Sequence, residues 1–184
     1  MKITILDGNP NASDEQFDGY LQRLASAMEA GGHEVAELTL REMEIEQCVG
    51  CFGCWVKTPG ECAVHEDDIE KVLRAMVNSD FVLYASTIVM GFPNEPLKRA
   101  IERTIPLLLP YFKFVDGEIR HKPRYDWSPR MGVLWERSGD TDDEDIEIVN
   151  EIFEQVAQEW SSTLSVNELT SRPAEEVAHA ISGL

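Results

Sequence analysis

The chain has 184 residues, and its composition is 43% hydrophobic and 27% charged. These proportions are typical of globular proteins, and they exclude a disordered, collagen-like or coiled-coil chain. Acidic residues outnumber basic residues 34 to 16, which gives a formal net charge of −18. A charge of that sign repels the phosphate backbone of nucleic acids, so we expect no nucleic-acid partner.

The N-terminus and the apolar segments favour a cytoplasmic protein without a membrane partner. The first residues reach Asp7 after a short apolar run and lack the long apolar region and cleavage site of a secretory signal. No apolar run, the longest being residues 81–92, approaches the roughly 18 residues that cross a bilayer. In the cytoplasm, four cysteines indicate metal or redox chemistry rather than structural disulfides.

Apolar runs and amphipathic segments alternate along the chain. The apolar runs predict strands at residues 2–6, 35–40, 81–86, 131–135 and 164–166. Helical spacing predicts helices at residues 17–28, 69–77, 94–108, 146–160 and 177–184, the third with Asn94 as its N-cap. Residues 110–130 form either a long loop or a hairpin around Asp116-Gly117.

Five strand–helix units predict an α/β fold. A closed barrel needs eight units, so an open doubly wound parallel sheet is favoured. We predict a flavodoxin-like sheet of five parallel strands in the order 2-1-3-4-5, with helices on both faces. We expect one domain over residues 1–184, with a cysteine-rich loop insertion at about residues 44–64. Loops at the carboxyl ends of the strands then share one edge, where such sheets bind ligands.

Four cysteines, Cys48, Cys51, Cys54 and Cys62, fall within fifteen residues. Two-residue gaps let a loop turn three thiolates toward one centre, and neighbouring glycines permit the tight backbone that this requires. A four-iron (4Fe-4S) iron-sulfur cluster is the leading hypothesis. Zinc is less favoured because its structural sites usually pair two Cys-x-x-Cys hairpins over a longer span. Free thiols or a disulfide are further alternatives, and no histidine spacing indicates another metal site.

The pattern Cys-x-Gly-Cys-x-x-Cys, followed by Gly60-Glu61-Cys62 and Asp67-Asp68, resembles the iron-sulfur flavoproteins and the wider NADPH-dependent FMN reductase-like group. The likeness extends over roughly residues 1–103, through Ser86 and the segment from Leu97 to Arg103. The resemblance implies FMN at the carboxyl end of the sheet, a cluster loop after strand two and electron transfer between them. It also implies assembly as dimers or tetramers.

The expected FMN site lies on three loops. Its candidate residues are Gly8, Asn9, Asn11 and Ser13 after strand one, Ser86, Thr87, Ile88, Met90 and Gly91 after strand three, and Glu136, Ser138 and Gly139 after strand four. A helix N-terminus binds phosphate through free N–H groups, with asparagine and serine side chains as further donors. The family's phosphate loop usually carries an arginine, whereas no basic residue stands between Lys2 and Arg23 here. Asp14 is instead a candidate cap for its own helix.

Two functions from different classes follow from these residues. The first is an FMN-binding oxidoreductase that moves electrons from NAD(P)H to a small-molecule or protein acceptor; because the cofactor does the chemistry, no catalytic side chain is named. The alternative is an FMN-less redox-sensing or metal-binding regulatory module, which the acidic loop after strand one motivates. No Gly-x-Ser-x-Gly elbow or Gly-x-x-x-x-Gly-Lys loop indicates a hydrolase or nucleotidase.

Residues 98–130 carry eight basic and four acidic residues, in contrast to the rest of the chain. Such a segment either attracts an anion such as a nicotinamide dinucleotide, or receives the acidic face of a second subunit, or forms a solvated loop. The residues concerned are Lys113, Arg120, His121, Lys122, Arg124 and Arg130.

Overall fold

The computed structural model describes residues 1–184 and contains a six-stranded main sheet. Five parallel strands have the order β2-β1-β3-β7-β8, and a short strand, β4, pairs antiparallel with β3. Their bounds are β1 Lys2–Asp7, β2 Glu34–Thr39, β3 Phe81–Val89, β4 Phe92–Pro93, β7 Arg130–Glu136 and β8 Leu164–Leu169. The five parallel strands therefore have the predicted order 2-1-3-4-5, and β4 is an addition that periodicity did not indicate.

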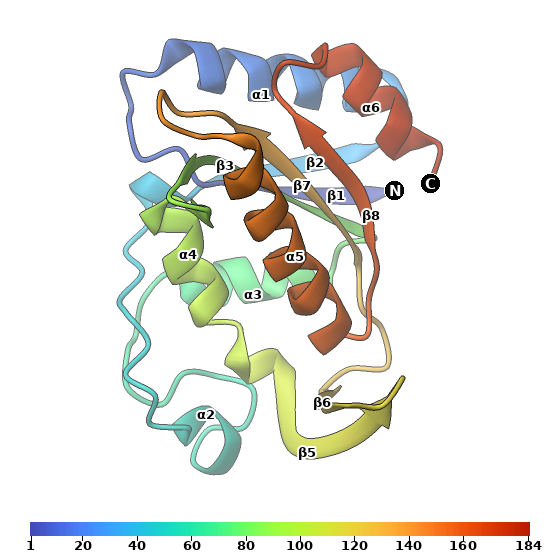
Figure 1. The fold of residues 1–184 in the computed structure, drawn as a ribbon. Helices are drawn as coiled ribbons and strands as arrows, with labels where there is room; N and C mark the ends of the chain where they lie inside the picture. The colour runs from blue at the N-terminus through green and yellow to red at the C-terminus, as the bar shows by residue number, and fades with distance from the viewer.

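Helices cover both faces of this sheet (Figure 1). On one face lie α1 (Glu15–Ala30) and α6 (Ala174–Ser182), and on the other lie α3 (Ile69–Val77), α4 (Glu95–Glu102) and α5 (Asp143–Glu159). Each face has its own cluster of buried apolar side chains. None of the helices is long and apolar enough to cross a membrane.

Strand β3 shows why the central strands are apolar without interruption. Phe81, Leu83 and Ala85 belong to the cluster under α1 and α6, whereas Val82 and Tyr84 belong to the cluster on the opposite face. Successive side chains of a strand point to opposite faces, so a strand covered on both sides needs apolar residues at every position.

The segment after α4 forms the hairpin that was one of two alternatives. Strands β5 (Leu108–Val115) and β6 (Glu118–Pro123) pair antiparallel in a separate two-stranded sheet. The turn residues Asp116 and Gly117 have φ of 51° and 88°, as a type I′ turn requires. Helix α4 is shorter than predicted, because it ends at its C-cap Arg103 and a separate 3₁₀ helix, η2 (Ile105–Leu107), follows with Pro106 in its first turn.

The cysteine-rich insertion lies between β2 and α3. A 3₁₀ helix, η1 (Leu40–Glu42), follows β2, and the chain then runs past α4 to the short helix α2 (Gly53–Val56). In Figure 1, α2 and the β5–β6 hairpin lie together at the lower end of the molecule, at the far end from α1 and α6. The insertion therefore extends from the carboxyl edge of the sheet to the hairpin, which α2 reaches.

Candidate functional site

The three loops expected to bind FMN lie at one edge of the sheet. Strands β1, β3 and β7 are neighbours, with Asp7 opposite Ala85 and Thr87 opposite Glu136 in the parallel registers. The loop after β1, the β3–β4 turn and the loop after β7 consequently leave the sheet side by side. This edge is where open parallel sheets place their ligands.

The loop after β1 is held by a ladder of side-chain hydrogen bonds. The N–H of Asn9 donates to Asp7 (2.9 Å), that of Asn11 donates to the Asn9 side chain (2.9 Å), and that of Ser13 donates to the Asn11 side chain (3.0 Å). Each acceptor lies two residues before its donor, the geometry of successive Asx turns. Asn9 is buried and also donates to Asp18, so its side chain is occupied within the protein.

Several donors in this loop remain open. The N–H groups of Ala12, Glu15 and Gln16 donate to no acceptor in the protein, and neither do the Asn11 amide nitrogen or the Ser13 hydroxyl. They surround the N-terminus of α1, where free N–H groups and the helix dipole favour an anion. Asp14 caps the helix, as its alternative role predicted, by accepting from the N–H of Phe17. The loop therefore offers unused N–H and side-chain donors, with several carboxylates close by in the sequence.

Gly8 brings this loop against α4. Its N–H donates to the carbonyl oxygen of Ala85 (2.8 Å), which continues the β1–β3 pairing by one residue. A Cβ at this position would lie 2.6 Å from the Leu97 Cβ and 3.0 Å from the Ala85 oxygen. Glycine is required because two elements approach closely.

After β3, most of the candidate side chains have structural contacts. The buried Ser86 hydroxyl accepts from the N–H of Asn94, and Thr87 Oγ1 accepts from the Asn94 amide, so both hold the N-cap of α4. Ile88 is fully buried in the core. Met90 is 80% exposed, and both Met90 and Gly91 have positive φ at the turn. Among the candidate residues after β3, Met90 is therefore the side chain that is free to contact a ligand.

After β7, the site is acidic. Burial, with the neighbouring charge of Asp14 as the second cause, raises the pKa of Glu136. Ser138 Oγ donates to the Ile88 carbonyl (2.6 Å), which ties this loop to β3, and Gly139 is exposed with open space around it. The loop after β7 thus borders the β3–β4 turn and brings Glu136 near Asp14.

Arg41 is a residue of this edge that the sequence analysis missed. It lies in η1, behind the loop after β1, where Nη1 donates to Asp7 (3.0 Å) and Nη2 donates to Asp18 (2.8 Å). Burial raises the pKa of Asp7 to about 6, although the N–H of Asn9 and the charge of Arg41 oppose this. The signal was present in the sequence, because strands one and two were predicted neighbours, and Arg41 follows strand two as closely as the acidic loop follows strand one.

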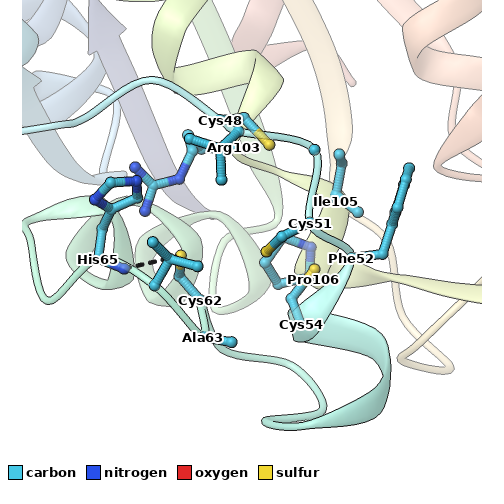
Figure 2. Close-up of a pocket in the computed structure, with 13 residues that line it drawn as sticks. Cys48, Cys51, Phe52, Cys54, Cys62, Ala63, His65, Arg103, Ile105 and Pro106 are labelled. Carbon is cyan, nitrogen blue, oxygen red and sulfur yellow. Dashed lines mark hydrogen bonds between the residues drawn. The ribbon is translucent and has the colours of Figure 1, made fainter.

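The four cysteines line one pocket together with His65 and Arg103 (Figure 2). All four are free thiols in this structure. No three cysteine, histidine or acidic side chains stand close enough together to hold a metal ion. The donor set suits an iron-sulfur cluster or zinc, since both prefer thiolates, but the side chains would have to turn toward a common centre.

Two of these thiols have shifted pKa values. Burial alone would raise the pKa of Cys62, but N–H groups of His65 and Val64 and the charge of Arg103 outweigh it, so the pKa is lowered. For Cys54, burial raises the pKa and the neighbouring cysteines add to the effect. Of these two thiols, Cys62 is therefore the one that loses its proton more easily, as metal binding requires.

The cysteine pocket and the edge of the sheet lie at opposite ends of α4. Asn94, the N-cap of α4, hydrogen bonds to Ser86 and Thr87 at the edge, whereas Arg103, the C-cap, lines the pocket. The helix has 8 residues, and a rise of about 1.5 Å per residue makes it about 12 Å long. Within one chain, the two candidate centres are about one short helix apart.

The basic residues of the hairpin are mostly engaged within the protein. Arg120 is 8% exposed and donates to Gln155, Gln158 and Glu159 of α5, and Arg124 donates to the Pro106 carbonyl. Lys113 donates to Ser161, and Arg130 donates to the Leu184 carbonyl. Lys122 is exposed and has no partner. Of the alternatives for this segment, an anion-attracting cluster retains only Lys122 as an unpaired cation, because Arg120 and Arg124 hold the hairpin in place.

Known proteins resemble this chain in sequence and in fold. An iron-sulfur flavoprotein of Archaeoglobus fulgidus is 31% identical over 104 residues, which cover 56% of this chain and 49% of that protein. The chain thus matches about half the length of this relative. A search of family models finds no match.

Solved structures share the fold. An azoreductase from Bacillus anthracis has a TM-score of 0.70 at 12% identity, with both chains fully covered. An FMN-dependent NADH-azoreductase from Bacillus anthracis, solved in complex with FMN, has a TM-score of 0.63 at 11% identity and covers all of this chain and 95% of the other. The flavodoxin-like fold and the resemblance to iron-sulfur flavoproteins are therefore confirmed.

Proposed function

We propose that this chain is an FMN-binding oxidoreductase that moves electrons from NAD(P)H through FMN to a small-molecule or protein acceptor. The observation that carries the proposal is the convergence of three loops at the carboxyl edge of β1, β3 and β7, with unused donors at the N-terminus of α1. The fold is shared with an azoreductase that binds FMN, and the sequence is similar to a protein named as a flavoprotein.

FMN, when bound, supplies the hydride and electron chemistry, and the chain supplies binding and orientation. The N–H groups of Ala12, Glu15 and Gln16, with the side chains of Asn11 and Ser13, are the donors for its phosphate. Met90 on the β3–β4 turn is the open apolar side chain for contact with the ring. No side chain is assigned to proton transfer.

Calorimetric titration with FMN and with NADPH tests this function. We expect FMN to bind with a dissociation constant of about 1 μM or below. The double variant Asn11→Ala, Ser13→Ala should weaken FMN binding, whereas Ser26→Ala, on an exposed turn of α1, should not. FMN that passes entirely through an ultrafiltration membrane after incubation with the wild-type protein contradicts the proposal.

The four cysteines are proposed to bind a metal centre, with an iron-sulfur cluster favoured over zinc. The shared pocket, the thiolate donor set and the name of the related protein support this. Anaerobic reconstitution should give iron and acid-labile sulfide bound to the wild-type chain and little to the variant Cys51→Ser, Cys54→Ser. Zinc in place of iron would support the weaker alternative, and equal, near-zero metal in both proteins would leave only free thiols or a disulfide.

A second function, an FMN-less redox-sensing or metal-binding module, is favoured by one observation. The loop after β1 uses its own side chains as acceptors, and its open donors stand beside Asp14 and near Glu136. The same FMN titration separates the two functions, because flavin binding at micromolar concentration excludes the module.

The remaining expectations concern the whole protein. We propose that residues 1–184 form one domain, that the protein is cytoplasmic, and that it assembles as a dimer or tetramer. Sedimentation equilibrium of the purified chain tests the assembly, and a molar mass equal to the 20.8 kDa of one chain contradicts it.

A further inference from the structure

The loop after β1 lies among acidic residues, whose charge opposes the binding of a phosphate. The acidic residues on or beside it are Asp7, Asp14, Glu15 and Asp18. No basic residue stands between Lys2 and Arg23. A carboxylate directed at the phosphate would repel it, because like charges a few ångströms apart interact strongly near a protein surface. Any anion site here needs a counter-charge from another part of the chain.

Arg41 is that counter-charge in this structure. Its guanidinium donates to Asp7 (3.0 Å) and twice to Asp18 (3.2 and 2.8 Å), and it reaches the Asn9 carbonyl at 3.4 Å. The Asp7 and Arg41 side chains are only 1% and 15% exposed. Arg41 Nε is buried without a partner. One guanidinium thus contacts the end of β1, the loop and the first turns of α1.

These contacts stand at the root of the loop. Asp7 begins the ladder of hydrogen bonds that continues through Asn9 and Asn11 to Ser13. Asp18 accepts from the Asn9 amide (2.7 Å) while it is held by Arg41. Arg41 therefore holds both carboxylates that anchor the ladder, Asp7 and Asp18.

We propose that Arg41 is a positioning residue for anion binding: it neutralises Asp7 and Asp18 behind the loop and so lets the N-terminus of α1 accept the FMN phosphate. This inference rests on the proposed FMN function and extends it. The positive charge that compensates the acidic loop comes from Arg41, in the segment after β2. Arg41 need not contact the phosphate itself. Arg41 acts through the loop, since its donors are directed at carboxylates.

The test compares FMN with riboflavin, which lacks the phosphate. For Arg41→Gln we expect the affinity for FMN to fall about tenfold or more, because Asp7 and Asp18 then repel the phosphate without a counter-charge. The affinity for riboflavin should change little. Arg41→Lys should retain part of the affinity for FMN. Arg23→Gln removes the same charge from α1 outside this network and should leave both affinities unchanged.

A compensating variant keeps the test decisive. Adding Asp18→Asn to Arg41→Gln removes one of the two carboxylates that are left without a cation, so FMN affinity should recover in part. Equal losses for FMN and riboflavin, or no loss for either, would overturn the inference.

Amide hydrogen exchange gives a readout without ligand. In Arg41→Gln, exchange at Asn9, Asn11 and Ser13 should be faster by about tenfold, while the centre of β1 is unchanged. If the wild-type chain binds no FMN, the proposed function is overturned, and hydrogen exchange alone then tests whether Arg41 holds the loop. If exchange in Arg41→Gln is unchanged, the role of Arg41 is overturned as well.

Discussion

Arg103 and Asp67 form a buried ion pair that joins the two ends of the cysteine-rich insertion. The pair is 2.8 Å long, and the two side chains are 3% and 6% exposed. Arg103 also donates to the Glu46 carbonyl, before the first cysteine, and Asp67 accepts from the N–H of Glu46 (2.9 Å), across the base of the insertion. Contacts among Glu46, Asp67 and Arg103 therefore join the two ends of the insertion without a bound metal.

Loss of this pair should strongly destabilise the protein. Arg103→Gln leaves the Asp67 carboxylate buried with no cation, and breaking a buried pair from one side costs about 3–5 kcal/mol. Urea unfolding measures the free energy. Lys98→Ala, which removes an exposed pair with Glu102 on the same helix, should cost less than about 1 kcal/mol. Similar losses in the two variants would contradict a special role for the buried pair.

The pH dependence of the pair has a definite sign. Burial alone would raise the pKa of Asp67, but the hydrogen bond from Arg103 and the N–H groups of Glu46 and Ile69 lower it below 3.8. A lowered carboxyl pKa gives stability that is present above the unfolded value and lost as the pH falls through the folded value. The pair is therefore at full strength at neutral pH.

Gly8 provides a test of the loop against α4. In Gly8→Ala the added methyl group would lie 2.6 Å from the Leu97 Cβ, so the loop or α4 has to move, at a cost of about 1–3 kcal/mol. FMN affinity should fall together with thermal stability. Gly139→Ala is the matched control, because nothing lies within 4 Å of its Cβ, and its melting temperature should match that of the wild type. A fully stable Gly8→Ala would show that the contact relaxes freely.

Most strands and helices of this chain could be predicted, because the spacing of apolar residues in each one reflects which of its faces is buried. The uninterrupted apolar run from Phe81 indicated a strand covered on both faces, and Asn94 before Pro96 indicated a helix start. The hairpin at Asp116-Gly117 could only be given as one of two alternatives, since short strands beside proline have weak periodicity. Its exposed Phe112 and Phe114 also obscured the alternation of apolar and polar residues.

Side-chain roles at the edge of the sheet were less accessible to prediction. Ser86 and Thr87 are expected beside the flavin, and the structure adds that their hydroxyl oxygens accept hydrogen bonds from Asn94. Arg41 was missed because its partners are 34 and 23 positions earlier in the sequence, and only strand pairing brings them together. Local sequence identifies where a site lies, whereas long-range packing decides which side chains remain free.

Asp7 should make stability depend on pH between about 4 and 6. Its pKa is raised from 3.8 to about 6, so the folded state binds a proton more readily than the unfolded state in that window. Stability therefore falls as the pH rises through the window, by about 1 kcal/mol between pH 5 and pH 7 for this group. Asp7→Asn keeps an acceptor for the N–H of Asn9 and removes the titration.

Urea unfolding of wild type and Asp7→Asn at several pH values isolates this effect. The difference between the two free energies of unfolding should shift in favour of the variant as the pH rises from 5 to 7, while other carboxyl groups cancel. A difference that is constant over this range would mean that Asp7 titrates as an ordinary exposed carboxyl.

Trp55 should control the exposure of the cysteine segment. Its indole N–H donates to the carbonyls of Ile105 and Leu108, and its ring stacks on Phe52 at 4.9 Å and lies 5.3 Å from the His121 ring. Trp55 therefore fastens α2 to the start of the hairpin. Trp55→Phe keeps an aromatic ring and removes the donor, which should weaken local closure by about 1 kcal/mol.

Alkylation of individual cysteines, followed by mass spectrometry, measures that closure. Cys54, half-buried on α2, should react about fivefold faster in Trp55→Phe, because a loss of about 1 kcal/mol raises the open population by that factor. Cys51 is already exposed and serves as an internal reference that should change little. Trp127→Phe removes a comparable indole donor, which bonds the carbonyl of Ser79 just before β3. This variant should leave the alkylation rate of Cys54 unchanged. Equal acceleration of Cys54 in both tryptophan variants would indicate global destabilisation rather than release of the segment from the hairpin.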